Sequence, residues 1–263
     1  MNRASADAIG RVLDHLCRTI GPRFTGSKAA DRTVRYLETE FRRRLGNARV
    51  EPFRASAWDC RRAVLTAAGR RIECLPVSYT ASTPAGGIHG ELAVLEGMAG
   101  FERQRPRLRG RIGLYFGDCD FGDNPLSYRR IVRSGLKGLV LVPDRFVTDW
   151  PIAVGLAPAW IRHGRLPMVS VSYEAACRLA GMRKAAVRLE IQASLRRVQS
   201  ANVMADVPGT DPGGGMILVS AHHDTVPGSL GAFDNASGTA AVLELARLFA
   251  GAHPRRTLRF AVF

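Results

Sequence analysis

The sequence predicts an α/β fold that is interrupted by a β-rich module. Three observations lead to this prediction: two amphipathic helical segments within residues 1–46, short apolar runs separated by Gly and Pro between about residues 60 and 196, and a strand, loop, helix, strand order in residues 216–263. The chain has 263 residues, enough to bury a substantial core in one large or two smaller domains. We therefore expect three consecutive parts, residues 1–59, 60–196 and 197–263.

Two helices are expected before residue 47. Ser5 is a suitable N-cap for the first, which Gly21 and Pro22 end, and Ser27 and Gly46 delimit the second. The inner apolar positions recur at helical spacing. They are Ile9, Val12, Leu13, Leu16 and Ile20 in the first helix, and Ala30, Val34, Leu37, Phe41 and Leu45 in the second.

Residues 60–196 have a different sequence pattern, in which short apolar runs alternate with turn residues. The runs predicted as strands are RAVLTAA, GELAVLE, RIGLYF, GLVLVP, MVSVS and VRLEIQ, and those predicted as short helices are SYRRIVRSGL and YEAACRLAG. The stretch GDCDFGDN places Asp118, Asp120 and Asp123 close together, but its spacing departs from that of a calcium loop. A polar turn is the preferred interpretation there.

The last part returns to an α/β pattern. VQSANVMADVPG predicts a strand, and MILVSA, apolar on both faces, predicts a buried central strand. Asn235 can cap a helix that runs to Phe249, and TLRFAVF predicts another buried strand. Because the chain as given ends on this last strand, we expect a hydrophobic sheet edge there and self-association through it.

Composition and charge exclude several classes of protein. The net charge is +15, but the arginines are scattered along the chain and no nucleic-acid motif accompanies them, so no specific nucleic-acid partner is expected. No apolar stretch is long enough to cross a bilayer, and the N-terminus lacks an export signal. We expect a cytoplasmic protein without a membrane partner as given, or a secreted or periplasmic one if a leader is missing. The five cysteines are widely spaced and are expected to be free thiols.

The chemistry of the chain is concentrated in residues 222–235. His222, His223 and Asp224 follow a predicted strand at its carboxyl end, where α/β proteins gather ligands, and strand alternation places His222 and Asp224 on one side and His223 on the other. Asp234 comes after a Gly-rich loop, and its two oxygens could bridge two metal ions. A His-x-Asp pair alone is more often a solvated turn, and Asp-Asn before a helix is an ordinary cap. Their order and setting together are more specific.

These motifs resemble those of the zinc aminopeptidase family, which includes leucyl aminopeptidases and the glutamate carboxypeptidase and transferrin-receptor relatives. The family pattern is His-x-Asp, then Asp-Asn-x-Ser-Gly and a helix, as in residues 222–238; IGPRFTGS and SANVMA also resemble it. The resemblance implies a zinc-peptidase, phosphorylase/hydrolase-like mixed-sheet sandwich that is incomplete at its C-terminus. It also implies that residues 60–196 are an inserted protease-associated domain.

Residue by residue, the resemblance implies that His222 binds one zinc ion, that Asp224 is the catalytic-site carboxylate that orients the ligands, and that Asp234 bridges two zinc ions before a cis peptide bond. The implied reaction is hydrolysis of the N-terminal bond of a peptide or protein substrate by zinc-activated water. The family's general-base Glu and later ligands follow a strand like TLRFAVF, beyond Phe263. We therefore expect the chain as given to be an inactive fragment; the alternative is a non-catalytic scaffold or protein-interaction member of the family.

Overall fold

The structure is a computed structural model that describes residues 3–117, 124–145, 147–182 and 186–263. The predicted turn with Asp118, Asp120 and Asp123 lies outside the described residues. The chain divides into two compact units, a core unit of residues 1–57 and 196–263 and an inserted unit of residues 58–195. The identity of the inserted segment as a protease-associated domain stays a prediction.

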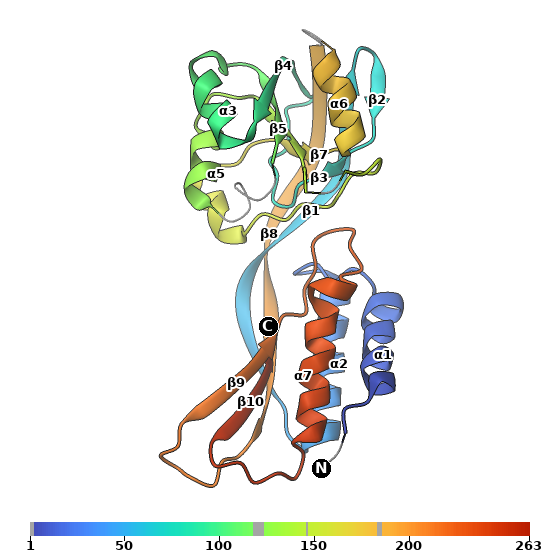
Figure 1. Cartoon of the computed structure of the whole chain (residues 1–263), viewed down its shortest axis with the longest axis vertical. Coiled ribbons are helices and arrows are strands. Elements are labelled where there is room, and N and C mark those ends of the chain that lie inside the picture. The colour runs from blue at the N-terminus through green and yellow to red at the C-terminus, as the bar shows by residue number, and fades with distance from the viewer. Residues whose placement is uncertain (1–2, 118–123, 146, 183–185) are drawn as a thin grey trace. The chain divides into compact units, whose positions relative to one another are not determined.

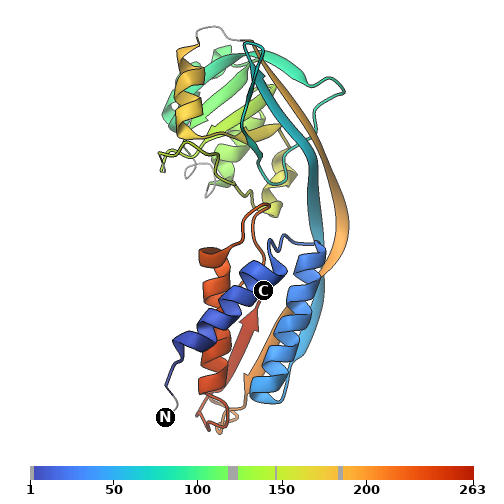
Figure 2. The same cartoon turned by 90° about the vertical axis from the view of Figure 1, so that its right-hand side faces the viewer.

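The core unit begins with the two predicted helices, and both are confirmed. Helix α1, Ala6–Asp14, is capped by Ser5 and continues as a π-helical segment, His15–Ile20, as far as Gly21. Helix α2, Lys28–Leu45, ends at Gly46, whose φ of +73° is the left-handed conformation that glycine adopts without strain. Helix α7, Ser237–Leu248, contacts both α1 and α2 (Figures 1 and 2).

The sheet of the core unit is mixed, as expected. Strand β8, Ala186–Val207, pairs antiparallel with β10, Thr257–Val262, and β10 pairs parallel with β9, Met216–Ala221. Two predicted strands, VRLEIQ and VQSANVMADV, are one continuous strand, β8, and RAVLTAA is the end of the long strand β1, Arg49–Ala67. Strands β1 and β8 neighbour each other in the sheet, and each contains one of the unit boundaries.

The prediction that β9 is buried and that β10 forms the sheet edge is wrong. Strand β10 has a neighbour on each side, and among the described residues β9 pairs with β10 alone. Met216, Ile217 and Leu218 are consequently exposed by 50%, 44% and 51%. The apolar pattern of MILVSA indicated a strand suited to burial, but burial depends on neighbours that the pattern does not specify.

The three helices cover one side of this sheet (Figure 1). Leu16, Leu37 and Phe41 from the helices at the N-terminus, Leu243 from α7 and Phe260 from β10 are all at least 99% buried in one cluster. This cluster fixes the start of α7 against the carboxyl ends of β9 and β10. The candidate site residues lie at that junction.

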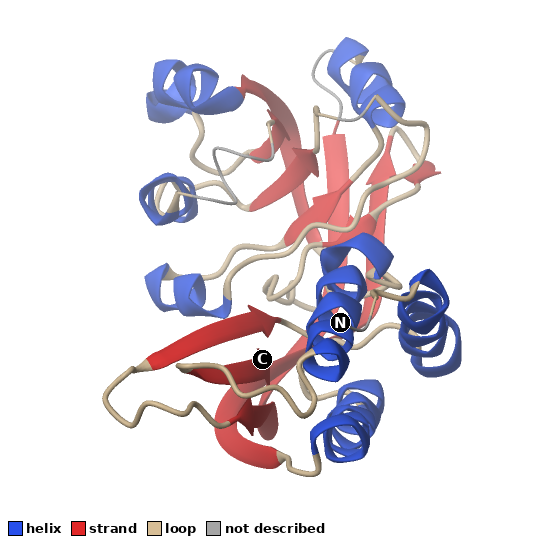
Figure 3. Cartoon of the chain, turned by 60° about the horizontal axis from the view of Figure 1, so that its bottom comes forward, coloured by secondary structure: helices blue, strands red, loops and turns tan. Residues whose placement is uncertain are grey.

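The inserted unit contains a parallel group of strands with helices beside it (Figure 3). Its strands are β2 Arg70–Ile72, β3 Leu75–Pro76, β4 Ile88–Glu96, β5 Ile112–Phe116, β6 Gly138–Val142 and β7 Met168–Ser170, of which β4 to β7 are parallel neighbours. Its helices are α3 Gly97–Gln104, α5 Pro125–Val132, α6 Tyr173–Gly181 and the 3₁₀ segments Arg105–Arg107 and Pro158–His163. Helix α3 was not predicted, because Gly97 and Gly100 are poor helix formers. No described helix has both the length and the apolar character needed to span a membrane.

Replacing Ser27 with Ala should lower the free energy of unfolding by about 1 kcal/mol. The reason is that the Ser27 hydroxyl accepts a hydrogen bond from the Ala30 amide at 3.1 Å, which would lose its acceptor. Urea unfolding measures the change. The control is Thr39→Ala, since the exposed Thr39 hydroxyl only bonds back to the Arg35 carbonyl; equal stabilities of the two variants would contradict the capping role.

Candidate functional site

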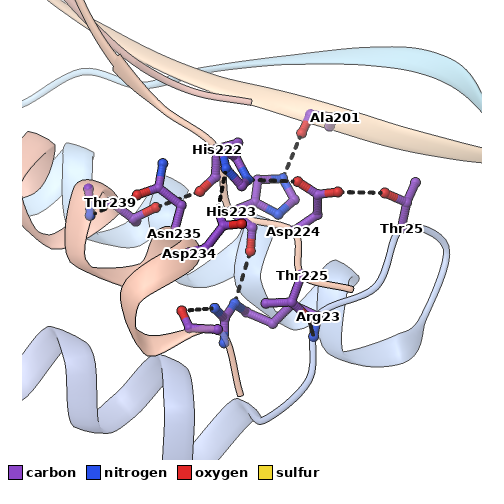
Figure 4. Close-up of polar contacts among 12 residues, drawn as sticks. Arg23, Thr25, Ala201, His222, His223, Asp224, Thr225, Asp234, Asn235 and Thr239 are labelled. Carbon is purple, nitrogen blue, oxygen red and sulfur yellow. Dashed lines mark hydrogen bonds and ion pairs between the residues drawn. The ribbon is translucent and has the colours of Figure 1, made fainter. Parts of the chain in front are cut away.

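The site is built on the end of strand β9. Phe263 donates its amide to the Ala221 carbonyl at 2.9 Å, and His223 donates its amide to the Phe263 carbonyl at 2.7 Å. These bonds continue the parallel ladder past the last residue of β9 and fix the direction of the backbone. The predicted alternation is confirmed: His222 and Asp224 contact each other, while His223 is buried away from them (Figure 4).

The imidazole of His222 lies between two carboxylates. Its Nδ1 is 3.0 Å from Asp224 Oδ1, and its Nε2 is 2.9 Å from Asp234 Oδ1 (Figure 4). The Thr25 hydroxyl donates to the other Asp224 oxygen at 3.4 Å, and the Thr239 hydroxyl donates to the His222 carbonyl at 3.1 Å. The structure therefore brings the three predicted site residues together. All three side chains are partly open to solvent.

Asp234 is placed by the turn that leads into α7. The peptide bond between Asp234 and Asn235 is cis, as the resemblance implies. The Asn235 side chain accepts a hydrogen bond from the Gly238 amide at 3.1 Å, so the predicted capping contact is present at the first turn of α7. A Cβ atom at Gly238 would overlap the Asn235 side-chain oxygen, which explains the need for glycine at this position.

His223 is buried and lies apart from the proposed ligands. Its side chain is only 3% exposed, and its Nε2 lies 3.3 Å from the Ala201 carbonyl oxygen. Burial lowers the pKa of His223 below its ordinary value, which favours the neutral ring. The ring thus packs beneath the site, and its position opposite His222 keeps it away from Asp234.

Two further contributors come from the N-terminal motif IGPRFTGS. Thr25 contacts Asp224, and the fully buried Arg23 donates to the backbone carbonyls of His223 and Leu230. The sequence pattern indicates no individual role for either residue. Nothing in the sequence distinguishes Arg23 from the other basic residues, of which the chain has 38 in all. Only the motif IGPRFTGS indicated that this segment belongs near the site.

His222, Asp224 and Asp234 offer imidazole nitrogen and carboxylate oxygen, the donor types that zinc binds. Zinc takes imidazole nitrogen and carboxylate oxygen at about 2.0–2.2 Å, so two such ligands of a tetrahedral ion stand roughly 3.3 Å apart. His222 Nε2 and Asp234 Oδ1 are 2.9 Å apart, which requires a shift of only a few tenths of an ångström. Asp224 beside Nδ1 matches the carboxylate that usually orients a metal-binding imidazole. These residues fit two ligands of a zinc site.

The described residues supply no third ligand. Among them, no group of three His, Cys, Asp or Glu side chains could hold a metal ion. Catalytic zinc is usually held by three protein ligands and a water. The described residues therefore offer two donors, His222 and Asp234, where such a site needs three protein ligands.

Residues 202–263 match peptidase family M28. The matched M28 segment contains His222, Asp224 and Asp234, and the suspected relation to zinc peptidases is thereby supported.

Relatives extend the similarity over nearly the whole chain. The probable lipoprotein aminopeptidase LpqL of Mycobacterium tuberculosis is 25% identical over 99% of this chain and 52% of its own length. Human carboxypeptidase Q is 24% identical over 94% of this chain and 56% of its own length. The chain thus spans about half the length of the curated relatives it matches.

Solved structures show the same fold. The zinc aminopeptidase BSAP from Bacillus subtilis superposes with a TM-score of 0.73 at 23% identity, covering 99% of this chain and 61% of that one. A peptidase M28 precursor from Shewanella amazonensis gives a TM-score of 0.82 at 17% identity, covering 99% and 64%. The mixed α/β architecture expected from the sequence is confirmed by these structures.

Proposed function

We propose that this chain carries part of the zinc site of an M28 peptidase that hydrolyses the N-terminal bond of peptides with zinc-activated water. The observation that carries the proposal is the position of His222, with one ring nitrogen facing Asp234 and the other held by Asp224. The relatives include proteins named aminopeptidases and a carboxypeptidase, which supports peptide-bond hydrolysis at a chain end.

Each residue has a separate proposed role. His222 Nε2 and the Asp234 carboxylate would hold zinc, and Asp234 has a second oxygen with which it could also serve a second ion. Asp224 accepts from Nδ1–H and so keeps Nε2 unprotonated and aimed at the metal. When bound, zinc polarises the scissile carbonyl and lowers the pKa of water toward ~7.

We further propose that the remaining ligands and the general base belong to a region beyond residue 263. The resemblance places them after a strand like β10, and the relatives are about twice as long as their matched part. On this proposal residues 1–263 bind zinc weakly and do not turn over substrate by themselves. The exposed strand β9 then provides the edge for the proposed self-association.

The test compares residues 1–263 with a protein extended through the region that the relatives have in addition. Zinc content is measured, together with release of a chromophore from an aminoacyl anilide. A series of dipeptides with an unmodified C-terminus, which carry no anilide, serves as the carboxypeptidase control. We expect zinc-dependent release only from the extended protein, lost with a chelator and restored by zinc. An extended, folded protein that contains no zinc and cleaves neither substrate class would favour the non-catalytic alternative.

A further inference from the structure

Arg23 lies at the centre of the backbone segments that form the candidate site. Its side chain is completely buried, and its guanidinium lies within hydrogen-bond distance of five backbone carbonyl oxygens, three of which share the two N–H groups of Nη1. The acceptors are His223 at 2.9 Å, Leu16 at 2.9 Å, Gly21 at 3.0 Å, Leu230 at 2.9 Å and Gly231 at 3.3 Å. Burying a charge is costly unless it is well satisfied, so this network requires an explanation.

The acceptors belong to three segments: the end of the first helical segment and the two ends of the loop between His222 and Asp234. Leu16 and Gly21 belong to the end of the first helical segment, which is anchored in the core. His223 directly follows His222, and Gly231 precedes Asp234 by three residues. Arg23 therefore ties both ends of the loop that separates the two proposed zinc ligands to the same helical segment. Figure 4 shows its contact with the His223 carbonyl group.

Two other contacts hold the same loop against Arg23. The Arg23 amide donates to the Thr225 hydroxyl at 2.9 Å. Gly231 is packed so closely that an added Cβ would lie 3.1 Å from Arg23 Nη2 and would overlap the Thr225 methyl group. The loop is thus fixed by packing as well as by hydrogen bonds at the residues next to the ligands.

Only arginine suits this arrangement. Its planar guanidinium carries five N–H donors on Nε, Nη1 and Nη2, which point in different directions within one plane. Lysine has the same charge but only three donors on a single nitrogen, so it cannot replace the contacts that Nε, Nη1 and Nη2 make with five carbonyl oxygens from separate positions. Charge and hydrogen-bond geometry can therefore be separated by one substitution.

We propose that Arg23 is a positioning residue that sets the separation of His222 and Asp234 by holding both ends of the intervening loop. The expected effect on zinc affinity rests on the proposed function. The positioning of the loop by Arg23 does not depend on a metal. Removing the network should let the loop open locally while the core around α2 stays closed. Zinc affinity should then fall as it does when orienting partners of ligands are lost, by about 10–100-fold.

The experiment uses the 263-residue chain as wild type, Arg23→Lys and Arg44→Met. Arg44 is a matched control, because its side chain is 5% exposed and pairs with Glu40 in α2 instead of contacting the loop. Amide hydrogen exchange is followed without metal at Ala236, whose amide bonds to the Gly231 carbonyl, and at Phe41 in α2. Zinc dissociation constants come from competition with a chromogenic chelator.

For Arg23→Lys we expect exchange at Ala236 to accelerate at least about 10-fold with no change at Phe41, and the zinc dissociation constant to rise about 10–100-fold. Arg44→Met should leave the dissociation constant within about 2-fold of wild type, whatever its effect on stability. Wild-type behaviour of Arg23→Lys, or faster exchange at both amides with unchanged zinc affinity, overturns the proposal.

If Arg23→Lys does not fold, Thr225→Val removes one hydrogen bond to the same residue and keeps the methyl packing. Zinc affinity should then fall roughly 3- to 10-fold, the effect of one hydrogen bond, and no change would overturn the proposal. A wild-type chain that binds no zinc contradicts the proposed function instead. In that case the exchange measurement, which needs no metal, still decides the role of Arg23.

Discussion

Replacing Asp234 with Ala is expected to weaken zinc binding by this chain at least about 100-fold, because loss of an orienting group alone costs 10–100-fold and here a direct ligand is removed. His222 would be left as the single proposed ligand among the described residues. Competition with a chromogenic chelator measures the change. The Asp234 side chain is 75% exposed, so the free energy of unfolding should stay within about 0.5 kcal/mol of wild type.

The control for this variant is Asp211→Ala. Asp211 is another carboxylate of the core unit, and it pairs on the surface with Arg255 at 3.3 Å. Its removal changes the net charge by the same amount and should leave zinc affinity unaltered. Equal losses in the two variants would mean that zinc is attracted by general charge, and the assignment of Asp234 would be wrong.

Replacing Gly231 with Ala should destabilise the core unit by about 3 kcal/mol, from the left-handed backbone and the overpacking together. The φ angle is +59°, and an added Cβ would lie 2.7 Å from the Asp234 carbonyl oxygen besides overlapping the Thr225 methyl group. The thermal midpoint should fall by roughly 6–12 °C for a chain of this size. Zinc affinity should fall as well, since the clash displaces the residues before Asp234.

Gly228 provides the comparison within the same loop. Its φ is +80°, but an added Cβ would meet no atom within 4 Å. Gly228→Ala should therefore cost only the left-handed conformation, about 1 kcal/mol. Should Gly231→Ala cost no more than Gly228→Ala, the close packing of the loop against Arg23 would be disproved.

Local signals predicted the helices well. Ser5, Ser27 and Gly46 fix helix ends through hydrogen bonds and conformations that depend on the residue itself. The strands were recognised, but their lengths were not, since β8 runs continuously through a stretch interpreted as two strands. Strand length and burial depend on partners distant in sequence, which also explains why β9 is exposed in spite of its apolar residues.

The candidate site was predictable to a different degree for each residue. His222, Asp224 and Asp234 are near one another in sequence, and their spacing after a strand already places them together. Arg23 is about 200 residues from the carbonyl groups of His223 and Leu230 that it binds. Every residue has a backbone carbonyl group, so the sequence does not show which carbonyl groups act as acceptors. A side chain that binds only to such groups in the site cannot be recognised from the sequence pattern.

The central claim is that His222 and Asp234 share a metal ion. X-ray absorption at the zinc edge, recorded on the zinc-loaded chain and on His222→Ala, tests it most directly. We expect one imidazole nitrogen at about 2.0–2.1 Å and carboxylate oxygen at about 2.0–2.2 Å from zinc, with the imidazole signal lost in the variant. A zinc spectrum that is unchanged by His222→Ala would contradict the claim, because the metal would then be bound elsewhere.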